Sequence, residues 1–157
     1  MAVTVFFDTS VLVAGLVDFG PQSAPAQLLM HHVAEKHLAA TATAWHCCLE
    51  FFSVATRLPV EFRISPADAV ALLQEEVFAR MAVHDLPPAD RVPMLVAAGR
   101  DRIAGGRIYD AHIAEVAKAA GADVVVTDNR RHFLTALRHG MRVETPAEFV
   151  AVLKKSR

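Results

Sequence analysis

The sequence VTVFFDTSVLV, at residues 3–13, is the clearest indication of architecture in this chain. Residues 3–7 are apolar or β-branched, which predicts a short strand that is buried on both faces. Asp8 ends that run directly, and Thr9 and Ser10 follow it. A carboxylate in such a place is costly unless it is paired. Asp8 is therefore either a metal ligand at a strand end or the cap of a helix that begins there.

Short β-branched runs alternate with longer helical stretches along the rest of the chain, which is typical of a parallel α/β sheet. Further strands are predicted at residues 38–41, 83–86, 123–127 and 141–144. Helices are predicted at residues 21–36, 44–57, 65–82, 87–105, 108–120 and 127–137, and after residue 145. We expect a single domain over residues 1–157, with a three-layer α/β/α sandwich around a central, mainly parallel sheet of four or five strands.

The composition is that of a globular protein. Of the 157 residues, 54% are hydrophobic and 21% are charged, which excludes a disordered chain. No apolar stretch reaches the roughly 18 residues of a membrane-spanning helix, and the N-terminus lacks the basic segment of a signal peptide. We therefore expect a cytoplasmic protein without a membrane partner. Cys47 and Cys48 are adjacent, which predicts two buried thiols and no disulfide or zinc site.

Glu50 is the only acid in the predicted helix around residues 45–55, where Leu49 and Phe51 flank it. It is either part of an acidic cluster or a single exposed acid on the polar edge of the helix, beside Ser53 and Arg57.

Asp110 shares a predicted helix face with Ile113, Ala114 and Ala117, at the i+3, i+4 and i+7 positions. A carboxylate in this core-facing stripe needs a cation or several hydrogen-bond donors. The alternative is an acid of the first turn that the helix dipole favours.

Three acids on separate elements, each near the carboxyl edge of one sheet, fit a site for a hard cation. Ligands in open α/β sheets bind in the crevice beyond the carboxyl ends of the strands. Mg²⁺ prefers oxygen ligands and is commonly held by one or two carboxylates. The sequence therefore predicts a Mg²⁺ site, with Mn²⁺ as a substitute ion, at Asp8, Asp110 and Glu50.

Four segments in order resemble PIN-domain nucleases, and within them the VapC-type toxins of toxin–antitoxin pairs. They are FFDTSVLV at residues 6–13, CLEFFSVATR at 48–57, IYDAHIAEVA at 108–117 and VVTDNRRHF at 125–133. The resemblance covers nearly the whole chain and implies a PIN-like α/β/α sandwich. It implies that Asp8 and Asp110 are the principal Mg²⁺ ligands and that Glu50 completes the acidic cluster.

The resemblance also implies a fourth polar residue, which is either Asn129 or Asp128, because the family often carries Thr-x-Asp or Thr-x-Asn here. Thr9, Ser10 and Thr127 match small hydroxyl positions that orient the acids. Where many relatives have an acid just before the final Phe, this chain has His132.

The implied activity is endonucleolytic, metal-dependent RNA cleavage by the toxin of a toxin–antitoxin pair. The implied partners are a small cognate antitoxin of the VapB type and a second copy of the chain in a homodimer. The net charge of −1 gives no global support for RNA binding, so a local basic patch must provide it. Arg130, Arg131 and Arg107 are the candidates, and an ordinary solvated basic face is the alternative.

Two other functions are considered. One is a PIN fold that binds RNA or protein without cleavage, because Asn129 and His132 stand where acids are common. The other is a haloacid-dehalogenase-type phosphatase, which needs a second Asp two residues after the first. This chain has Ser10 there.

Overall fold

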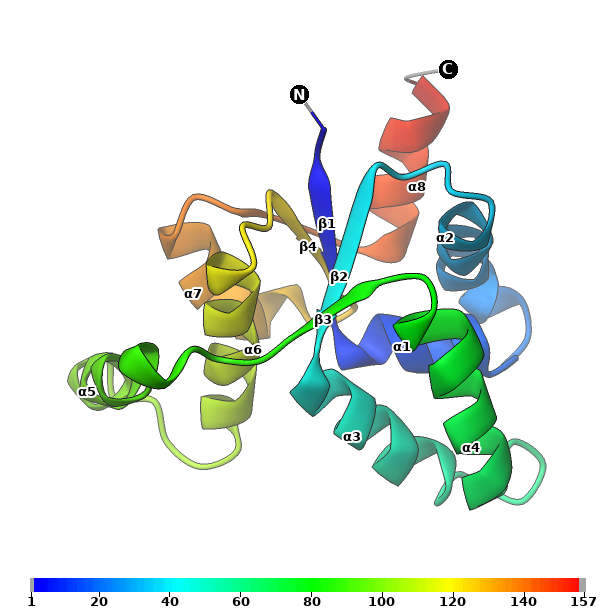
Figure 1. Ribbon diagram of the computed structural model, residues 1–157, viewed down its shortest axis with the longest axis horizontal. Helices are drawn as coiled ribbons and strands as arrows, with labels where there is room; N and C mark the ends of the chain where they lie inside the picture. Colours follow the sequence, from blue (N-terminus) through cyan, green and yellow to red (C-terminus); the bar gives the residue numbers. More distant parts are fainter. Residues whose placement is uncertain (1, 156–157) are drawn as a thin grey trace.

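The computed structural model describes residues 2–155, and its centre is a sheet of five parallel strands (Figure 1). The strands, in chain order, are β1 (Thr4–Phe7), β2 (Ala40–Ala44), β3 (Ala82–His84), β4 (Val124–Val126) and β5 (Arg142–Glu144). They lie side by side in the order β3-β2-β1-β4-β5, and every neighbouring pair is parallel. The predicted parallel sheet of four or five strands is confirmed.

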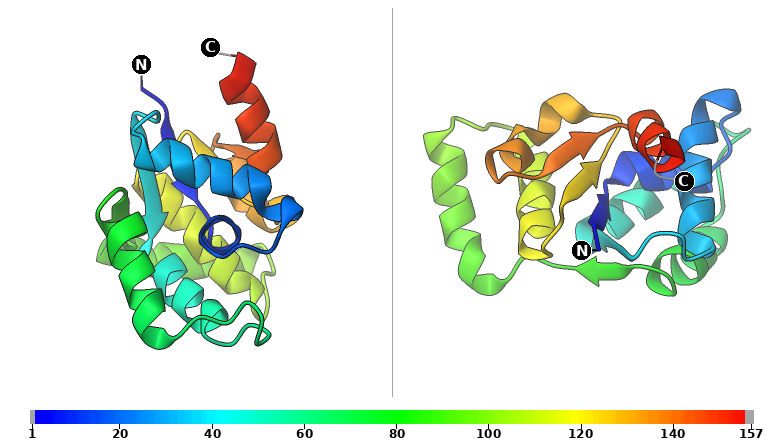
Figure 2. Two further views of the ribbon diagram at one scale, coloured as in Figure 1. Left: turned by 90° about the vertical axis from the view of Figure 1, so that its right-hand side faces the viewer. Right: turned by 90° about the horizontal axis from the view of Figure 1, so that it is seen from above.

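Helices cover both faces of this sheet. On the right in Figure 1 lie α1 (Thr9–Leu16), α2 (Ala24–Ala34), α3 (Trp45–Ala55), α4 (Pro66–Leu72) and α8 (Pro146–Lys155). On the left lie α5 (Arg91–Arg100), α6 (Arg107–Ala119) and α7 (Leu134–Arg138), with α5 outermost. Four short turns of other helical types join them: η1 (Pro21–Ser23), η2 (Leu73–Phe78), η3 (Pro88–Asp90) and η4 (Arg130–Phe133). The view from above in Figure 2 shows the sheet between the two layers, as the predicted α/β/α sandwich requires.

The core forms where the central strands meet both helical layers. Phe6 and Phe7 of β1 point to opposite faces and are both fully buried, as are all three valines of β4. Leu12 of α1 and Ile113 of α6 are buried on the two sides. Because β1 and β4 are central strands with both faces covered, their sequences are continuously apolar. This fixes the carboxyl ends of both strands at one edge of the sheet.

Two predicted strands are displaced from their observed positions. β2 spans Ala40–Ala44 and not residues 38–41, because the register with β1 pairs Thr4 with Ala40 and Phe6 with Ala42. The Thr43 hydroxyl also donates a hydrogen bond of 2.8 Å to the Phe7 carbonyl, which holds the end of β2 against β1. β3 spans Ala82–His84 and not residues 83–86.

Four predicted helices are interrupted. The stretch at 21–36 is divided into η1 and α2. The helix predicted at 65–82 begins as expected, with the Ser65 hydroxyl accepting the Asp68 N–H, but beyond Leu72 it continues as the wider π-helical turn η2. The stretch at 87–105 is divided into η3 and α5, which ends at Arg100. The stretch at 127–137 is divided into η4 and α7.

The end of α6 follows its sequence closely. Gly121 adopts a φ of 73°, a left-handed conformation that glycine allows at low cost, and the Ala122 N–H returns to the Ala117 carbonyl at 3.0 Å. This closure turns the chain directly into β4.

The two adjacent cysteines are buried free thiols, as predicted. Burial raises the pKa of the Cys47 thiol to about 12 and that of Cys48 to about 11. In residues 2–155, no helix is long and apolar enough to cross a membrane.

Candidate metal and nucleic-acid site

Asp8 lies directly after β1, at the carboxyl edge of the sheet, and its side chain has two roles. Its Oδ1 accepts the Thr9 N–H at 2.7 Å, which makes Asp8 the cap of α1. Its Oδ2 accepts hydrogen bonds from the Ser10 hydroxyl at 3.0 Å and from the Thr127 hydroxyl at 2.8 Å. The two interpretations of Asp8 are therefore compatible: the cap holds the carboxylate in place, and the carboxylate faces a pocket.

Asp8 is only 4% exposed, and this burial determines its ionisation. Loss of solvation raises the pKa of Asp8, and the three hydrogen bonds from Thr127, Ser10 and Thr9 oppose that rise without cancelling it. The negative charge of Asp110 raises the pKa further. A cation beside Asp8 would relieve both the desolvation and the repulsion.

Glu50 projects from α3 and is joined to the Asp8 region by Thr9. The Thr9 hydroxyl donates to Glu50 Oε1 at 3.0 Å, while the Thr9 N–H serves Asp8. His46 lies one helical turn earlier, with Nε2 3.2 Å from the same Glu50 oxygen. His46 was not among the predicted site residues. Its spacing of four residues from Glu50 on one helix is the pattern that would have predicted this pair.

Asp110 lies in the first turn of α6, with its side chain 29% exposed. Its Oδ2 is 3.1 Å from His132 Nδ1, which η4 brings across from the segment after β4. Burial raises the pKa of Asp110, His132 lowers it, and the charge of Glu50 raises it again. The contact with His132 depends on how η4 packs on α6, so the linear sequence carried no signal for it.

One pocket of about 370 Å³ brings the predicted acids together. Its lining residues are Asp8, Thr9, Ser10, Val13, Ala14, Phe19, Glu50, Val54, Asp110 and Asn129. All three predicted metal ligands face this space, although the first and the last of them, Asp8 and Asp110, are 102 residues apart in sequence. Of the two candidates for the fourth polar residue, Asn129 lines the pocket and Asp128 does not. Asp128 instead donates its backbone N–H to the Ser10 hydroxyl at 3.1 Å.

The chemistry of the acid pocket fits a hard divalent cation. Carboxylate and amide oxygens are the ligands that Mg²⁺ prefers. The negative charge of Asp110 raises the pKa of Asp8, and that of Glu50 raises the pKa of Asp110. Within residues 2–155, no three His, Cys, Asp or Glu side chains have the spacing of a fully formed metal site. This agrees with the contacts above, in which His132 and His46 occupy oxygens of Asp110 and Glu50.

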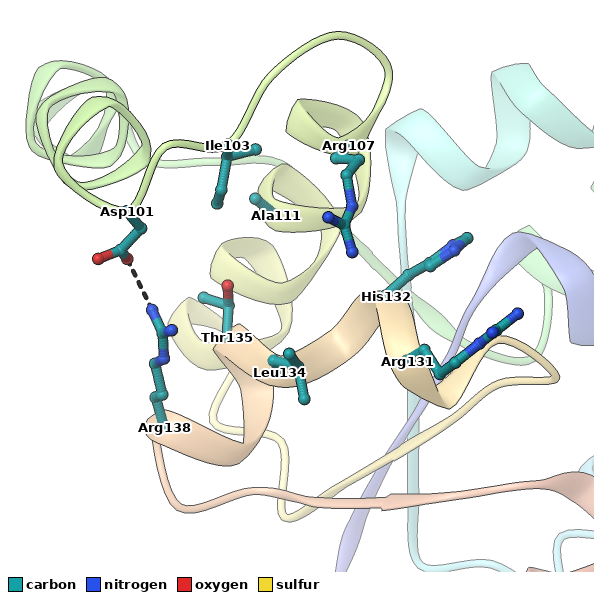
Figure 3. A pocket seen from close by; sticks show the side chains of 9 residues that line it. All are labelled: Asp101, Ile103, Arg107, Ala111, Arg131, His132, Leu134, Thr135 and Arg138. Carbon is teal, nitrogen blue, oxygen red and sulfur yellow. Dashed lines mark hydrogen bonds and ion pairs between the residues drawn. The ribbon is translucent and has the colours of Figure 1, made fainter.

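A second, basic pocket of about 130 Å³ is lined by His132 and by Ala111, which follows Asp110 on α6 (Figure 3). Arg107 reaches into it from α6, and Arg131 and His132 project together from η4. Arg138 also lines it but is paired with Asp101 at 2.7 Å. Two of the three predicted RNA-binding arginines, Arg107 and Arg131, thus share one pocket.

Arg130, the third of these arginines, is directed elsewhere. It forms an ion pair with Glu148 of α8 at 3.0 Å and is not among the residues that line the basic pocket.

Comparison with known proteins agrees with this arrangement. The PIN domain family matches residues 4–131, which is most of the chain and includes all the acids of the pocket. Ribonuclease VapC40 of Mycobacterium tuberculosis is 32% identical over 123 residues, which are 78% of this chain and 85% of VapC40. The chain belongs to the PIN domain family, and its resemblance to the VapC type is confirmed.

A further relative is Ribonuclease VapC27 of Mycobacterium tuberculosis, 35% identical over 89 residues. The match covers 57% of this chain and 63% of VapC27, so the chain spans less than two thirds of that relative's length.

Solved structures support the same fold. VapC20 of Mycobacterium tuberculosis, described as a Sarcin-Ricin loop cleaving toxin, superposes with a TM-score of 0.63 at 17% identity, over 84% of this chain and 94% of VapC20. VapBC2 from Rickettsia felis, solved bound to a promoter DNA fragment, gives a TM-score of 0.60 at 15% identity, over 90% and 98% of the two chains. The PIN fold is thereby established, and a haloacid-dehalogenase-type phosphatase is not supported.

Proposed function

We propose that this chain is a divalent-metal-dependent endoribonuclease and the toxin of a toxin–antitoxin pair. The observation that carries the proposal is the acid pocket, in which Asp8, Glu50, Asp110 and Asn129 face one another at the carboxyl edge of the sheet. The curated relatives VapC27 and VapC40 are named ribonucleases, which supports the same activity.

Asp8 and Asp110 would hold Mg²⁺, or Mn²⁺ in its place, and Glu50 would complete the cluster. When bound, the ion would polarise a phosphoryl oxygen and lower the pKa of a neighbouring water. The Thr127 and Ser10 hydroxyls both donate to Asp8 Oδ2 and so fix the orientation of this carboxylate. Glu50, oriented by Thr9 through Oε1, would accept the proton of the attacking water, and the ribose oxygen that leaves the phosphorus would take up a proton from solvent.

The substrate would be RNA, with its flanking phosphate held by Arg107 and Arg131. Both guanidinium groups border the basic pocket next to Asp110, so a strand whose phosphate lies in the acid pocket can extend into positive potential. A small antitoxin would bind across this face, and a homodimer is the proposed assembly. VapBC2, solved bound to a promoter DNA fragment, is a structural neighbour that supports an antitoxin partner.

The test is cleavage of single-stranded RNA by the purified protein with Mg²⁺ and with EDTA. We expect cleavage with Mg²⁺ alone, and its loss in Asp8→Asn and in Asp110→Asn while circular dichroism stays unchanged. Glu61→Gln, an exposed acid outside the pocket, is the matched control and should keep full activity. Full activity of either pocket variant would contradict the proposal.

A second candidate is a PIN fold that binds RNA or protein without cleaving it. The observation that favours it is the contact of His132 with Asp110, because an imidazole occupies an oxygen that a metal would need. The same assay separates the two: RNA binding without any cleavage in Mg²⁺ or Mn²⁺ would favour the non-catalytic function.

A further inference from the structure

A third pocket, of about 380 Å³, lies between α5 and α6 and belongs to neither site described above. Its lining residues are His46, Asp85, Leu86, Arg91, Met94, Leu95, Ile108, Tyr109 and His112. The volume is within the range of small-molecule sites. Met94 and Leu86 are buried and give the pocket an apolar floor, while Asp85 and Arg91 are exposed at its rim.

Three aromatic rings form one wall of this pocket. The Tyr109 ring stacks on the His46 ring, with centroids 5.5 Å apart and planes inclined by 11°. The His112 ring meets His46 edge-on at 5.4 Å. Tyr109 nevertheless remains 56% exposed, which is high for an aromatic side chain that already has a stacking partner. Its exposed surface can accept a further flat, aromatic group.

The aromatic wall is continuous with the acid pocket. His46 is the shared member, because its ring lines the third pocket while its Nε2 lies 3.2 Å from Glu50. Tyr109 directly precedes Asp110 on α6. A group stacked on Tyr109 would therefore be linked to the acid pocket through His46, whose ring stacks on Tyr109 and whose Nε2 contacts Glu50.

We propose that the pocket between α5 and α6 binds one unpaired nucleobase of the RNA strand, stacked on Tyr109. This inference rests on the proposed function, since the sugar–phosphate chain of that nucleotide would continue into the acid pocket. Stacking on aromatic side chains is how single-stranded nucleic acids are commonly bound, and it needs a base that is free of its partner strand. The Asp85 carboxylate can accept a hydrogen bond from an exocyclic amino group, and the Arg91 guanidinium can donate to a ring nitrogen or carbonyl.

The composition of the pocket favours a base over a protein side chain. An apolar floor alone would suit an aliphatic residue of an antitoxin or of a second copy. Here a stacked ring pair stands beside one acceptor and one donor at the rim, which matches a flat heterocycle with polar edges. Arg91 in this pocket and Arg107 in the basic pocket add the positive charge that a phosphodiester requires.

The chain contains a single tyrosine, which makes this proposal directly measurable. Protein labelled with 3-fluorotyrosine has one ¹⁹F resonance, and that resonance reports on Tyr109 alone. It is recorded in EDTA, so that no cleavage occurs, with a mixed-sequence single-stranded RNA 12-mer as the probe. The comparisons are the same 12-mer annealed to its complement and a ribose-phosphate oligomer of equal length without bases.

We expect the resonance to shift with the single-stranded RNA and to stay in place with the duplex and with the oligomer that lacks bases. In unlabelled protein, Tyr109→Ala should weaken binding of the RNA about tenfold, the order expected for one lost base–aromatic stack. Tyr109→Phe should bind as the wild type does. Phe78→Ala, which removes an exposed aromatic outside this pocket, is the matched control and should have no effect.

The opposite results would overturn the proposal. If the resonance shifts equally with the RNA and with the oligomer that lacks bases, Tyr109 contacts the sugar–phosphate backbone and not a base. If it shifts with none of the probes, Tyr109 does not contact RNA. A resonance that moves with protein concentration and not with RNA would assign this surface to a second copy. Failure of the proposed nuclease activity is a separate result, because it appears as absent cleavage in Mg²⁺ while the shift in EDTA is unchanged.

Discussion

The hydroxyl of Thr127 donates a hydrogen bond of 2.8 Å to Oδ2 of Asp8, across 119 residues of sequence. Both residues are buried, and each follows directly after a central strand. The same hydroxyl oxygen accepts the Asn129 N–H at 3.0 Å. Thr127 thus joins the carboxylate at the end of β1 to the turn that places Asn129 in the acid pocket.

Replacing Thr127 by Val should disturb Asp8 while leaving the shape of the core nearly unchanged. The lost hydrogen bond to a buried carboxylate should lower the free energy of unfolding by about 1.5–3 kcal/mol at neutral pH. It should also raise the pKa of Asp8, because this bond favours the charged form. If cleavage needs ionised Asp8, the acidic limb of the pH–rate profile moves to higher pH. Thr127→Ser keeps the hydroxyl and should restore the wild-type profile; identical profiles for Val and Ser would contradict this account.

The burial of Asp8 predicts that the metal-free protein gains stability when this charge is removed. Its pKa is raised above the ordinary value of 3.8, so the folded state holds the proton more tightly than the unfolded state. Stability therefore falls as the pH rises from about 3.8 through the folded-state pKa. In EDTA at pH 7, Asp8→Asn should melt above the wild type, by about 2–4 °C for each kcal/mol of relieved charge burial.

The complementary measurement adds Mg²⁺ to the wild type. We expect Mg²⁺ to raise its melting temperature more at pH 7 than at pH 4, because the raised pKa of Asp8 makes protons compete with the metal as the pH falls, and to leave Asp8→Asn unchanged. If the metal-free Asp8→Asn variant melts below the wild type at pH 7, the fold tolerates the charged Asp8 carboxylate better than a neutral amide, which would contradict this prediction.

The packing of α1 on α2 predicts a contrast between two glycines. A Cβ at Gly15 would lie 2.5 Å from the Met30 Cγ and 3.0 Å from the Ala26 carbonyl oxygen, so Gly15→Ala should cost about 1–3 kcal/mol of stability. At Gly99 in α5 no atom lies within 4 Å of the added Cβ. Gly99→Ala should be neutral or stabilising by up to about 1 kcal/mol. Urea denaturation of both variants tests this contrast. Equal free energies of unfolding for the two variants would mean that α1 and α2 can move apart at little cost.

The two arginines of the basic pocket should carry much of the salt dependence of RNA binding. Each phosphate contact on a single strand contributes about 0.7 to the slope of log K against log salt, so Arg107→Ala with Arg131→Ala should flatten it by up to about 1.4. Arg130→Ala should change it less, because Arg130 is paired with Glu148. The charge control is Arg142→Ala, because Arg142 lies at the amino end of β5 and not at the carboxyl edge of the sheet. If Arg142→Ala flattens the slope as much as the loss of Arg107 and Arg131 does, the effect comes from net charge and not from the basic pocket.

Much of the fold and of the acid pocket could be predicted because both depend on local sequence patterns. Residues 3–7 are apolar or β-branched and residues 124–126 are three valines, which identifies central strands. Polar residues after such strands must lie at one edge of a parallel sheet. The position of Asp8 was therefore predictable from the first strand, whereas strand positions did not distinguish Asn129 from Asp128. Asp110 was predictable because it interrupts the apolar face of α6.

Other features depend on contacts that no local pattern encodes. The strand β2, with the sequence ATATA, has weak apolar character, and only its register against β1 fixes where it begins. The contact of His132 with Asp110 arises because η4 packs on α6. Arg130 and Arg131 are equivalent in sequence, yet α8 provides Glu148 as a partner for Arg130 only.

The central claim is that Asp8 and Asp110 hold one divalent cation. A crystal of the wild-type protein grown with Mn²⁺ tests it most directly, through the anomalous scattering of the ion. We predict a single strong anomalous peak in the acid pocket, in direct contact with a carboxylate oxygen of Asp8 or Asp110, with the His132 ring moved away from Asp110. A crystal saturated with Mn²⁺ that shows no peak there, or a peak held by residues outside this pocket, would contradict the account.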